Sequence, residues 1–200
     1  CASFLYNLQK GIEMIGSGRA RVVLVGASEA PITQECIEGY GAMSALATEE
    51  GLRHIEGRDD VDFRRASRPF SHNCGFTLAE SGQFFMLMDD ELALQLGADI
   101  HGAVPDVFGS ADGFKKSISA PGPGNYLTMA KSVYSAMQIR GPGVVRQRSF
   151  VHAHGSSTPA NRFGMRVRLT LTTSSISLST SPGPSQCSVT TSGPARLIRL

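Results

Sequence analysis

The chain has 200 residues, of which 41% are hydrophobic and 18% charged, so it has the composition of a globular protein and the length of one domain or part of one. A net charge of only +2 argues against a nucleic-acid-binding surface, and the lack of any run of 18 apolar residues argues against a membrane-spanning helix. No CxxC pair occurs, so we expect neither a disulfide framework nor a zinc knuckle, and a reducing, cytoplasmic compartment. The cysteines are Cys1, Cys36, Cys74 and Cys187.

The N-terminal part of the chain predicts a helix followed by a strand. In residues 2–16, apolar side chains recur at spacings of three and four, which indicates a helix with one buried face. That face consists of Leu5, Leu8, Ile12 and Ile15. The continuous apolar run at 21–30 predicts a strand that is buried on both faces.

A second helix, a charged segment and a second strand follow. Residues 33–47 predict a helix, and its inward-facing side chains are expected to be Ile37, Tyr40 and Leu46. The charged stretch 49–65 has little apolar content and predicts a solvent-exposed loop or short helix. The segment 75–90 has "FFMLM" at its centre and predicts a second buried strand.

The middle of the chain continues the alternation of helices and strands. Residues 91–97 predict a short helix, and 98–108 predict a third strand that Pro105 interrupts. An amphipathic helix over 126–139 is followed by a strand over 149–155. The alternation predicts an α/β fold with crossover connections.

The tail at 163–200 differs in composition from everything before it. Of its 38 residues 14 are Ser or Thr and none is Asp, Glu or Lys, although "LTLTTSSISLSTS" alternates weakly like a strand. The tail is either a flexible linker or sequence outside the reading frame of the fold. We favour the second interpretation and expect the tail to be disordered or out of frame.

Cys1 precedes the first predicted helix and is a candidate nucleophile. The unpaired N–H groups and the dipole at a helix N-terminus stabilise an anion, and therefore a thiolate. A thiolate in such a position suits covalent catalysis. The alternative is that Cys1 is a small buried hydrophobic side chain, which is the more common environment of a single cysteine.

His152 and His154 lie two positions apart on the predicted strand 149–155, so both should point to the same face. This spacing suits a pair of metal ligands, but zinc needs a third protein ligand, and no second cluster supplies one. Structural histidines are the ordinary alternative. The "GSSTP" after the strand places hydroxyl and backbone N–H groups at its carboxyl end, where α/β sheets bind ligands. This favours a functional role for His154.

Together these segments resemble the β-ketoacyl-[acyl-carrier-protein] synthases, the condensing enzymes of the thiolase-like superfamily. "CAS", "GRARVVLVGASEA" and "GYGAMSALAT" are similar to the family's nucleophile, core strand and following helix. "ASRPFSHNCGFTLAESGQFFML" resembles its "SRPF…GF…E" block, and "SADGFKKSISAPGPGN" its Ser-x-Asp…Pro linker. "VHAHGSSTPANR" resembles its "AHGTxT" histidine motif. The resemblance covers residues 1–162.

The resemblance implies a thiolase-like layered α-β-α-β-α sandwich built of two similar halves. Residues 1–97 would form the latter part of the N-terminal half, and 98–162 the start of the C-terminal half. Since the chain lacks an initiator methionine, we expect a fragment of a longer protein, inactive by itself.

The resemblance also implies roles for individual residues. Cys1 would accept the acyl group, and its backbone N–H would form half of the oxyanion hole. His154 would be the first catalytic histidine, and Ser156 and Thr158 would hold the phosphopantetheine arm. Glu80 matches an acidic residue near the family's site. No metal is implied.

The implied reaction is a decarboxylative condensation in fatty acid or polyketide synthesis. An acyl group passes to Cys1, malonyl thioester loses CO₂, and the resulting enolate attacks the acyl-cysteine to give a 3-oxoacyl thioester. The implied partners are acyl carrier protein and, in the full-length protein, a second subunit of a homodimer. No cofactor is implied beyond the phosphopantetheine that carries the substrates, and neither nucleic acid nor membrane.

The chain departs from the family pattern, and three alternatives remain. The family's second histidine, in a Lys-Ser…Gly-His context, and that lysine are both missing. One alternative is a thiolase-like acyltransferase that uses coenzyme A. Another is a hydrolase in which Cys1 is an N-terminal nucleophile and its own amino group the base. The third is a degenerate, non-catalytic subunit.

Overall fold

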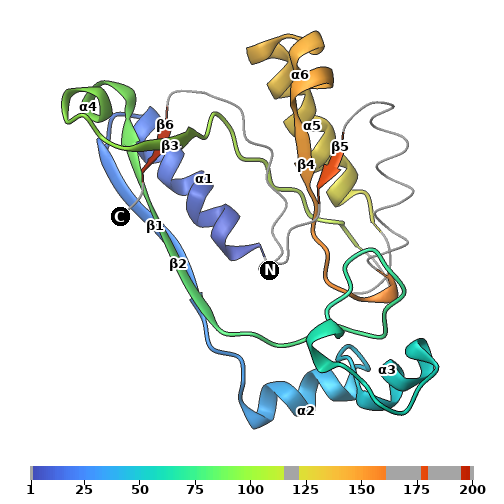
Figure 1. The fold of residues 1–200 in the computed structure, drawn as a ribbon. Helices are drawn as coiled ribbons and strands as arrows, with labels where there is room; N and C mark the ends of the chain where they lie inside the picture. Colours follow the sequence, from blue (N-terminus) through green and yellow to red (C-terminus); the bar gives the residue numbers. More distant parts are fainter. Residues whose placement is uncertain (1, 115–121, 161–176, 180–194, 199–200) are drawn as a thin grey trace.

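A computed structural model describes residues 2–114, 122–160, 177–179 and 195–198, the last two ranges for their backbone alone (Figure 1). The elements are α1 (Ser3–Gly16), β1 (Val22–Glu29), α2 (Gln34–Ala42), α3 (Glu49–Glu56), the 3-10 turn η1 (Phe63–Arg65), β2 (Ser81–Asp89), α4 (Asp90–Gln95), β3 (Ile100–Ala103), α5 (Gly124–Arg140), α6 (Pro142–Arg148), β4 (Phe150–His152), β5 (Ser177–Ser179) and β6 (Ala195–Ile198). Among the described residues, no helix is both long and apolar enough to cross a membrane.

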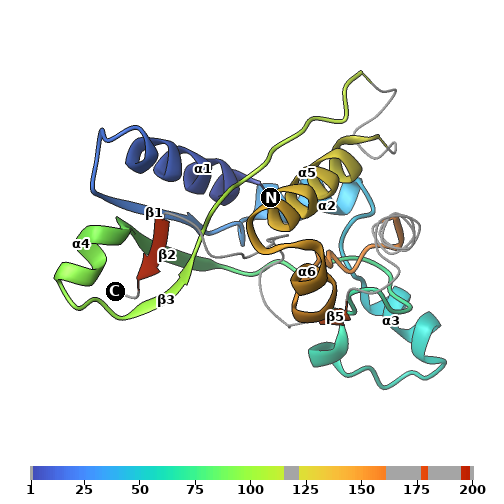
Figure 2. The same cartoon turned by 90° about the horizontal axis from the view of Figure 1, so that it is seen from above.

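The first core lies between α1 and one face of the β1–β2 ribbon, along which α1 runs (Figures 1 and 2). Leu8 on α1, Val25 on β1 and Leu87 on β2 are buried there together. The backbone of α1 comes closest to the ribbon at Gly11, where a Cβ atom would lie 2.7 Å from Val25 Cγ1. The predicted helix and both predicted strands are thus confirmed, and the helical periodicity identified most of the buried face.

The other face of the ribbon is only partly covered, which corrects the prediction of a strand buried on both faces. Met86 and Met88 pack against α4 at one end of β2, but Leu24 and Phe84 are exposed. Phe84 lies against Gly26, its partner in the β1–β2 register. Because β1 pairs only with β2 among the described strands, one of its edges also remains open.

The main sheet has the strand order β1-β2-β6-β3, and all of its pairings are antiparallel. Among the described strands of this sheet, the expected crossover connections between parallel strands are therefore absent, because β1 and β2 form a long antiparallel ribbon. The third strand is shorter than predicted: it ends at Ala103, two residues before Pro105, and is irregular between Ile100 and Gly102.

The tail contributes two short strands to the described residues. β5 pairs in parallel with β4, and β6 lies between β2 and β3. The weak strand-like alternation of the sequence agrees with β5. The remainder of the tail lies outside the described residues, so the boundaries 1–97, 98–162 and 163–200 remain a prediction.

The helices α2 and α3 lie together at the end of the ribbon away from α4 (Figure 1). Ile37 and Tyr40 are exposed, so the prediction that they face inward is wrong. The Tyr40 ring instead packs edge-on against Phe76, with 5.1 Å between ring centroids. The charged stretch forms α3, with Thr48 as its N-cap and Gly57 in a left-handed conformation at its C-cap.

A second core joins α5 to β4. Met129 and Val133 on α5 pack against Val151 and Ala153, and Phe70 reaches into this cluster from the "SRPF" segment. This core places the residues after β4 beside residues 66–70, and the candidate site is built from that arrangement.

Candidate functional site

The proposed nucleophile, Cys1, lies outside the described residues. The helix that follows it begins at Ser3, and its N-cap is Ala2, whose side chain makes no capping hydrogen bond. The first N–H groups of α1 are therefore not capped by that side chain. Uncapped N–H groups at a helix N-terminus favour a nearby anion, and the role of Cys1 remains a prediction.

The histidine motif begins in β4 and continues beyond its end. β4 ends at His152, so His152 and His154 do not share the predicted strand 149–155. The side chains still alternate, since Val151 and Ala153 are buried while His152 and His154 are half-buried. We call residues 153–158 the histidine loop. Within it, Ser156 Oγ lies 3.0 Å from Thr158 Oγ1, so the two hydroxyls predicted to hold phosphopantetheine are adjacent.

The histidine loop is anchored by Ser157, which the sequence analysis did not single out. Its side chain is only 2% exposed, and its backbone has φ of 63°, an unusual conformation for a residue with a side chain. Ser157 Oγ accepts a hydrogen bond of 2.8 Å from the backbone N–H of Arg68. The loop is thereby tied to residues 66–70, which we call the clamp segment.

A close backbone approach reinforces this contact. A Cβ atom on Gly155 would lie 2.6 Å from Pro69 Cβ and 3.1 Å from Phe70 Cε2, so only glycine fits next to His154. Phe70 itself has φ of 62° and packs into the core formed by α5 and β4. The clamp segment therefore contacts the histidine loop at two positions, Gly155 and Ser157.

The clamp segment is in turn held by α3. Glu56, the last residue of α3, is 6% exposed, and its carboxylate pairs with Arg68 on one oxygen and Arg58 on the other. The hydrogen bond from Arg58 lowers the pKa of the Glu56 carboxyl, and Arg68 adds to this effect, while burial opposes it. The carboxylate therefore stays ionised in spite of its burial.

Asn73 completes the setting of Arg68. Its side-chain Nδ2 donates a hydrogen bond of 3.1 Å to the carbonyl oxygen of Arg68, and the Asn73 side chain is buried. Both backbone groups of Arg68 are thus engaged, one by Ser157 and one by Asn73. Sequence reasoning included these residues in quoted motifs but assigned no role to them, because their contacts join segments far apart in the chain.

Glu80 is hydrogen-bonded to the segment between β1 and α2. Its Oε1 accepts a hydrogen bond of 3.2 Å from the backbone N–H of Ile32, so it fixes the connection between β1 and α2. The roles predicted for Cys1, His154, Ser156, Thr158 and Glu80 remain predictions. Within the described part of the chain, no group of three or more His, Cys, Asp or Glu side chains could hold a metal ion.

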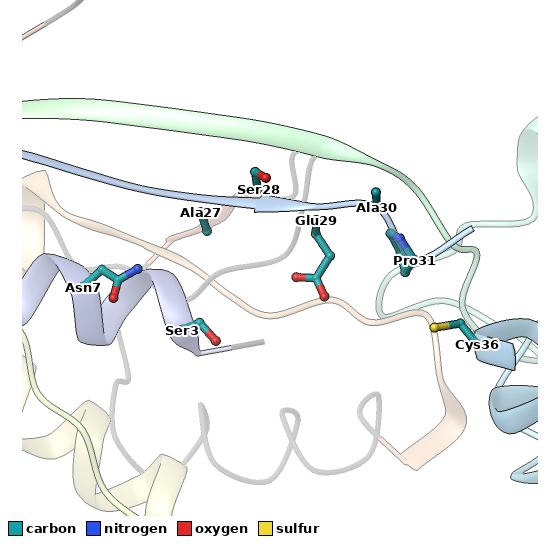
Figure 3. Close-up of a pocket in the computed structure, with 8 residues that line it drawn as sticks. All are labelled: Ser3, Asn7, Ala27, Ser28, Glu29, Ala30, Pro31 and Cys36. Atoms are coloured by element: carbon teal, nitrogen blue, oxygen red, sulfur yellow. The ribbon is translucent and has the colours of Figure 1, made fainter. Parts of the chain in front are cut away.

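An open pocket of about 480 Å³ is lined by the start of α1, the end of β1 and the start of α2 (Figure 3). Asn7, on α1, donates a hydrogen bond of 2.8 Å to the carbonyl oxygen of Gly26 and so ties the helix to β1. Glu29 projects from the end of β1, and Cys36 from the start of α2. The complete lining is Ser3, Asn7, Ala27, Ser28, Glu29, Ala30, Pro31 and Cys36.

Comparison with known proteins shows which family the chain resembles. Residues 1–93 match the family described as β-ketoacyl synthase, N-terminal domain. Over 162 residues the chain is 80% identical to the β-ketoacyl-[acyl-carrier-protein] synthase FabY of Pseudomonas aeruginosa. This part of the chain is similar to the β-ketoacyl synthases. The family assignment made from the four sequence motifs is confirmed.

The ketosynthase match covers 81% of this chain but only 26% of the length of the Pseudomonas relative. A 3-oxoacyl-[acyl-carrier-protein] synthase 2 of Vibrio cholerae is 32% identical over 163 residues, which are 80% of this chain and 36% of the relative. The chain therefore spans between a quarter and about a third of these two ketosynthases.

The fold of the chain is that of ketosynthases. The crystal structure of the noncanonical ketosynthase FabY from P. aeruginosa superposes with a TM-score of 0.85 at 70% identity, over 90% of this chain and 29% of that one. A type II polyketide ketosynthase, solved in complex with its acyl-carrier protein, superposes with a TM-score of 0.61 at 27% identity, over 90% of this chain and 42% of that one. The predicted fold class, a partial thiolase-like α/β structure, is confirmed.

Proposed function

We propose that the chain is a segment of a 3-oxoacyl-[acyl-carrier-protein] synthase, which joins an acyl thioester to malonyl-[acyl-carrier protein] with loss of CO₂. The observation that carries the proposal is the 80% identity with a β-ketoacyl-[acyl-carrier-protein] synthase over 162 residues. The proposal extends to a fatty acid or polyketide pathway, and to the division of residues 1–97 and 98–162 between two similar halves.

The proposed reaction uses Cys1 as the acyl acceptor. Its thiolate attacks the carbonyl carbon of an acyl thioester, the carrier-protein thiol leaves, and an acyl-cysteine forms. Malonyl thioester then loses CO₂, and the electron pair of the broken C–C bond forms an enolate. The enolate carbon attacks the acyl-cysteine carbonyl, which expels the Cys1 thiolate and yields the 3-oxoacyl thioester.

In this proposal His154 donates a hydrogen bond to the thioester oxygen on which negative charge develops. A preorganised donor stabilises that charge without rearranging during the reaction. The clamp segment supports such a role, because Gly155 and Ser157 fix the backbone on the C-terminal side of His154. Ser156 and Thr158, which lie beside each other, would bind the phosphopantetheine arm.

The proposed partner is acyl carrier protein, which delivers both thioesters, and the full-length protein would be a homodimer. No metal or separate cofactor enters this reaction. The pattern of cysteines, without a disulfide framework, supports a cytoplasmic location.

The acyl-transfer step can be tested on the 200-residue chain. We expect that brief incubation with acyl-[acyl-carrier protein] adds the acyl mass to the peptide that contains Cys1, as measured by mass spectrometry. Cys1→Ala should abolish the modification, whereas Cys36→Ala should not. With malonyl-[acyl-carrier protein] present, we expect no 3-oxoacyl product, because the sequence lacks the family's second histidine and its lysine.

The same experiment separates the alternatives. Acylation of Cys36 or Cys74 in place of Cys1 would contradict the proposed nucleophile. Equal acylation by acyl-coenzyme A would favour the thiolase-like acyltransferase. Formation of 3-oxoacyl product would show that the chain is catalytically complete, contrary to our expectation.

A further inference from the structure

The contact between α3 and the clamp segment is a buried ion pair that the proposed reaction does not use. The side chain of Glu56 is 6% exposed and that of Arg68 is 15% exposed. Such pairs add little net stability, because desolvation of both charges offsets their attraction, yet removing one partner is costly since it leaves the other charge buried. A buried pair of this kind favours one relative position of the two segments that carry its charges.

The hydrogen bonds of Arg68 show which contact the ion pair fixes. Its side chain pairs with Glu56 and also donates from Nε to the carbonyl oxygen of Arg65 at 2.7 Å. Its backbone N–H donates to Ser157 in the histidine loop. Arg68 is therefore held at its side chain by α3 and at its backbone by the loop that follows His154. We therefore expect that release of the Arg68 side chain from Glu56 loosens the backbone donor that Ser157 accepts from.

We propose that Glu56 is a positioning residue for the histidine loop and acts on it through Arg68. The chain of contacts runs from the carboxylate of Glu56 to the guanidinium of Arg68, from the Arg68 backbone to Ser157, and from Ser157 to the loop that begins beside His154. The catalytic meaning of this coupling rests on the proposed function, but the coupling itself does not.

In this proposal, the charged segment that contains α3 helps to position the histidine loop. Arg58 supports the coupling, because it pairs with the second oxygen of Glu56 and leaves the first oxygen to Arg68. The ion pair between Glu49 and Arg53 on the same helix offers a matched control. It is solvent-exposed, with both side chains about half accessible, and the other hydrogen bond of the Arg53 side chain goes to the carbonyl oxygen of Asp59.

The test compares Glu56→Gln and Glu56→Ala with the control Glu49→Gln in the 200-residue chain. Hydrogen–deuterium exchange is followed in peptides that cover 66–73, 153–160 and the ribbon strand 81–89. Loss of one charge-assisted hydrogen bond should speed exchange in the first two peptides by about tenfold, and less in Glu56→Gln, which keeps an acceptor oxygen. Exchange in β2 should stay unchanged, as should all three peptides in Glu49→Gln.

A second readout addresses the histidine itself. The rate at which diethyl pyrocarbonate modifies His154 should rise several-fold in Glu56→Ala, relative to that of His101 on β3 in the same molecule. Arg68→Lys, which keeps the charge but loses the planar fork, should reproduce the effect. These changes together would support the proposal.

Two results would overturn it. Unchanged exchange and unchanged His154 modification would show that the loop does not depend on Glu56. Faster exchange in all three peptides alike, or unfolding of both Glu56 variants, would show that Glu56 only stabilises the fold as a whole. No substrate enters these measurements. Failure of Cys1 acylation would therefore contradict the proposed function without affecting this inference. Unchanged exchange and His154 modification would contradict this inference without affecting the proposed function.

Discussion

Asp89, the last residue of β2, connects the residue before β1 with the first turn of α4. Its carboxylate accepts hydrogen bonds from Arg21, at 2.6 Å from Nε and 2.9 Å from Nη2, at the start of the ribbon. It also caps α4 by accepting from the backbone N–H of Leu92 at 2.8 Å. These bonds, that from Arg21 above all, lower the pKa of Asp89 to about 2.

We therefore predict that part of the stability is lost in acid through Asp89. Because its pKa is lower in the folded state than the ordinary value of 3.8, the contribution is complete above about pH 4 and disappears as the pH falls to about 2. Asp89→Asn should lower the urea midpoint at neutral pH and show a smaller further loss between pH 4 and 2. Asp99→Asn, at an 83% exposed side chain, is the control and should follow the parent profile. Parallel acid profiles for Asp89→Asn and the parent would contradict the assignment.

The histidine loop shows what residue patterns can and cannot predict at this scale. The motif itself located His154, Ser156 and Thr158 in one short segment. It could not identify Ser157 as the anchor, because that role depends on a left-handed backbone and on a donor 89 positions earlier in the chain. Glu56 was likewise hidden, since one buried acid in a charged stretch looks like its exposed neighbours.

Replacing a helical glycine with alanine should have opposite effects on stability in α1 and in α2. In α1, a Cβ on Gly11 would lie 2.7 Å from Val25 Cγ1 and 2.8 Å from Leu87 Cδ1. In α2, a Cβ on Gly39 would meet nothing within 4 Å. Alanine is favoured over glycine in a helix by about 1 kcal/mol, whereas overpacking costs about 1–3 kcal/mol.

We accordingly predict that Gly39→Ala raises the free energy of unfolding by up to about 1 kcal/mol, and that Gly11→Ala lowers it by about 1 kcal/mol. Denaturant unfolding of both variants measures the difference. Stabilisation by both substitutions would mean that α1 does not approach the ribbon as closely as described.

The sequence predicts most accurately those elements whose buried face follows a local pattern of apolar residues. α1, β1 and β2 follow from apolar patterns that span most of each element. The second helix was predicted too long and with the wrong face, because Ile37 and Tyr40 have helical spacing but no core beside them. Antiparallel pairing of β1 with β2 could not be predicted either, since a continuous apolar run does not define which strand lies beside it.

At the scale of the whole molecule, the outer face of the ribbon should govern solubility. Leu24 is 58% exposed there, next to an open strand edge, and such surfaces promote association. Leu24→Thr should therefore slow aggregation, measured by light scattering, and change the free energy of unfolding by less than about 0.5 kcal/mol.

Leu87→Thr is the matched control on the opposite face, where the side chain is 0% exposed. It should lower the free energy of unfolding by about 3 kcal/mol and accelerate aggregation. If Leu24→Thr destabilises the chain as much as Leu87→Thr does, the outer face is a second core and not a free surface.

Because 89 positions separate Arg68 from Ser157, Arg68 is synthesised well before its hydrogen-bond partner. At ordinary translation rates roughly 5–20 s pass between the two residues, long enough for α1 and the ribbon to fold as a unit. Throughout that interval the backbone N–H of Arg68 can bond only to water or to a substitute acceptor. The loop that follows His154 can therefore be anchored only late, after the ribosome has already synthesised α1 and the ribbon.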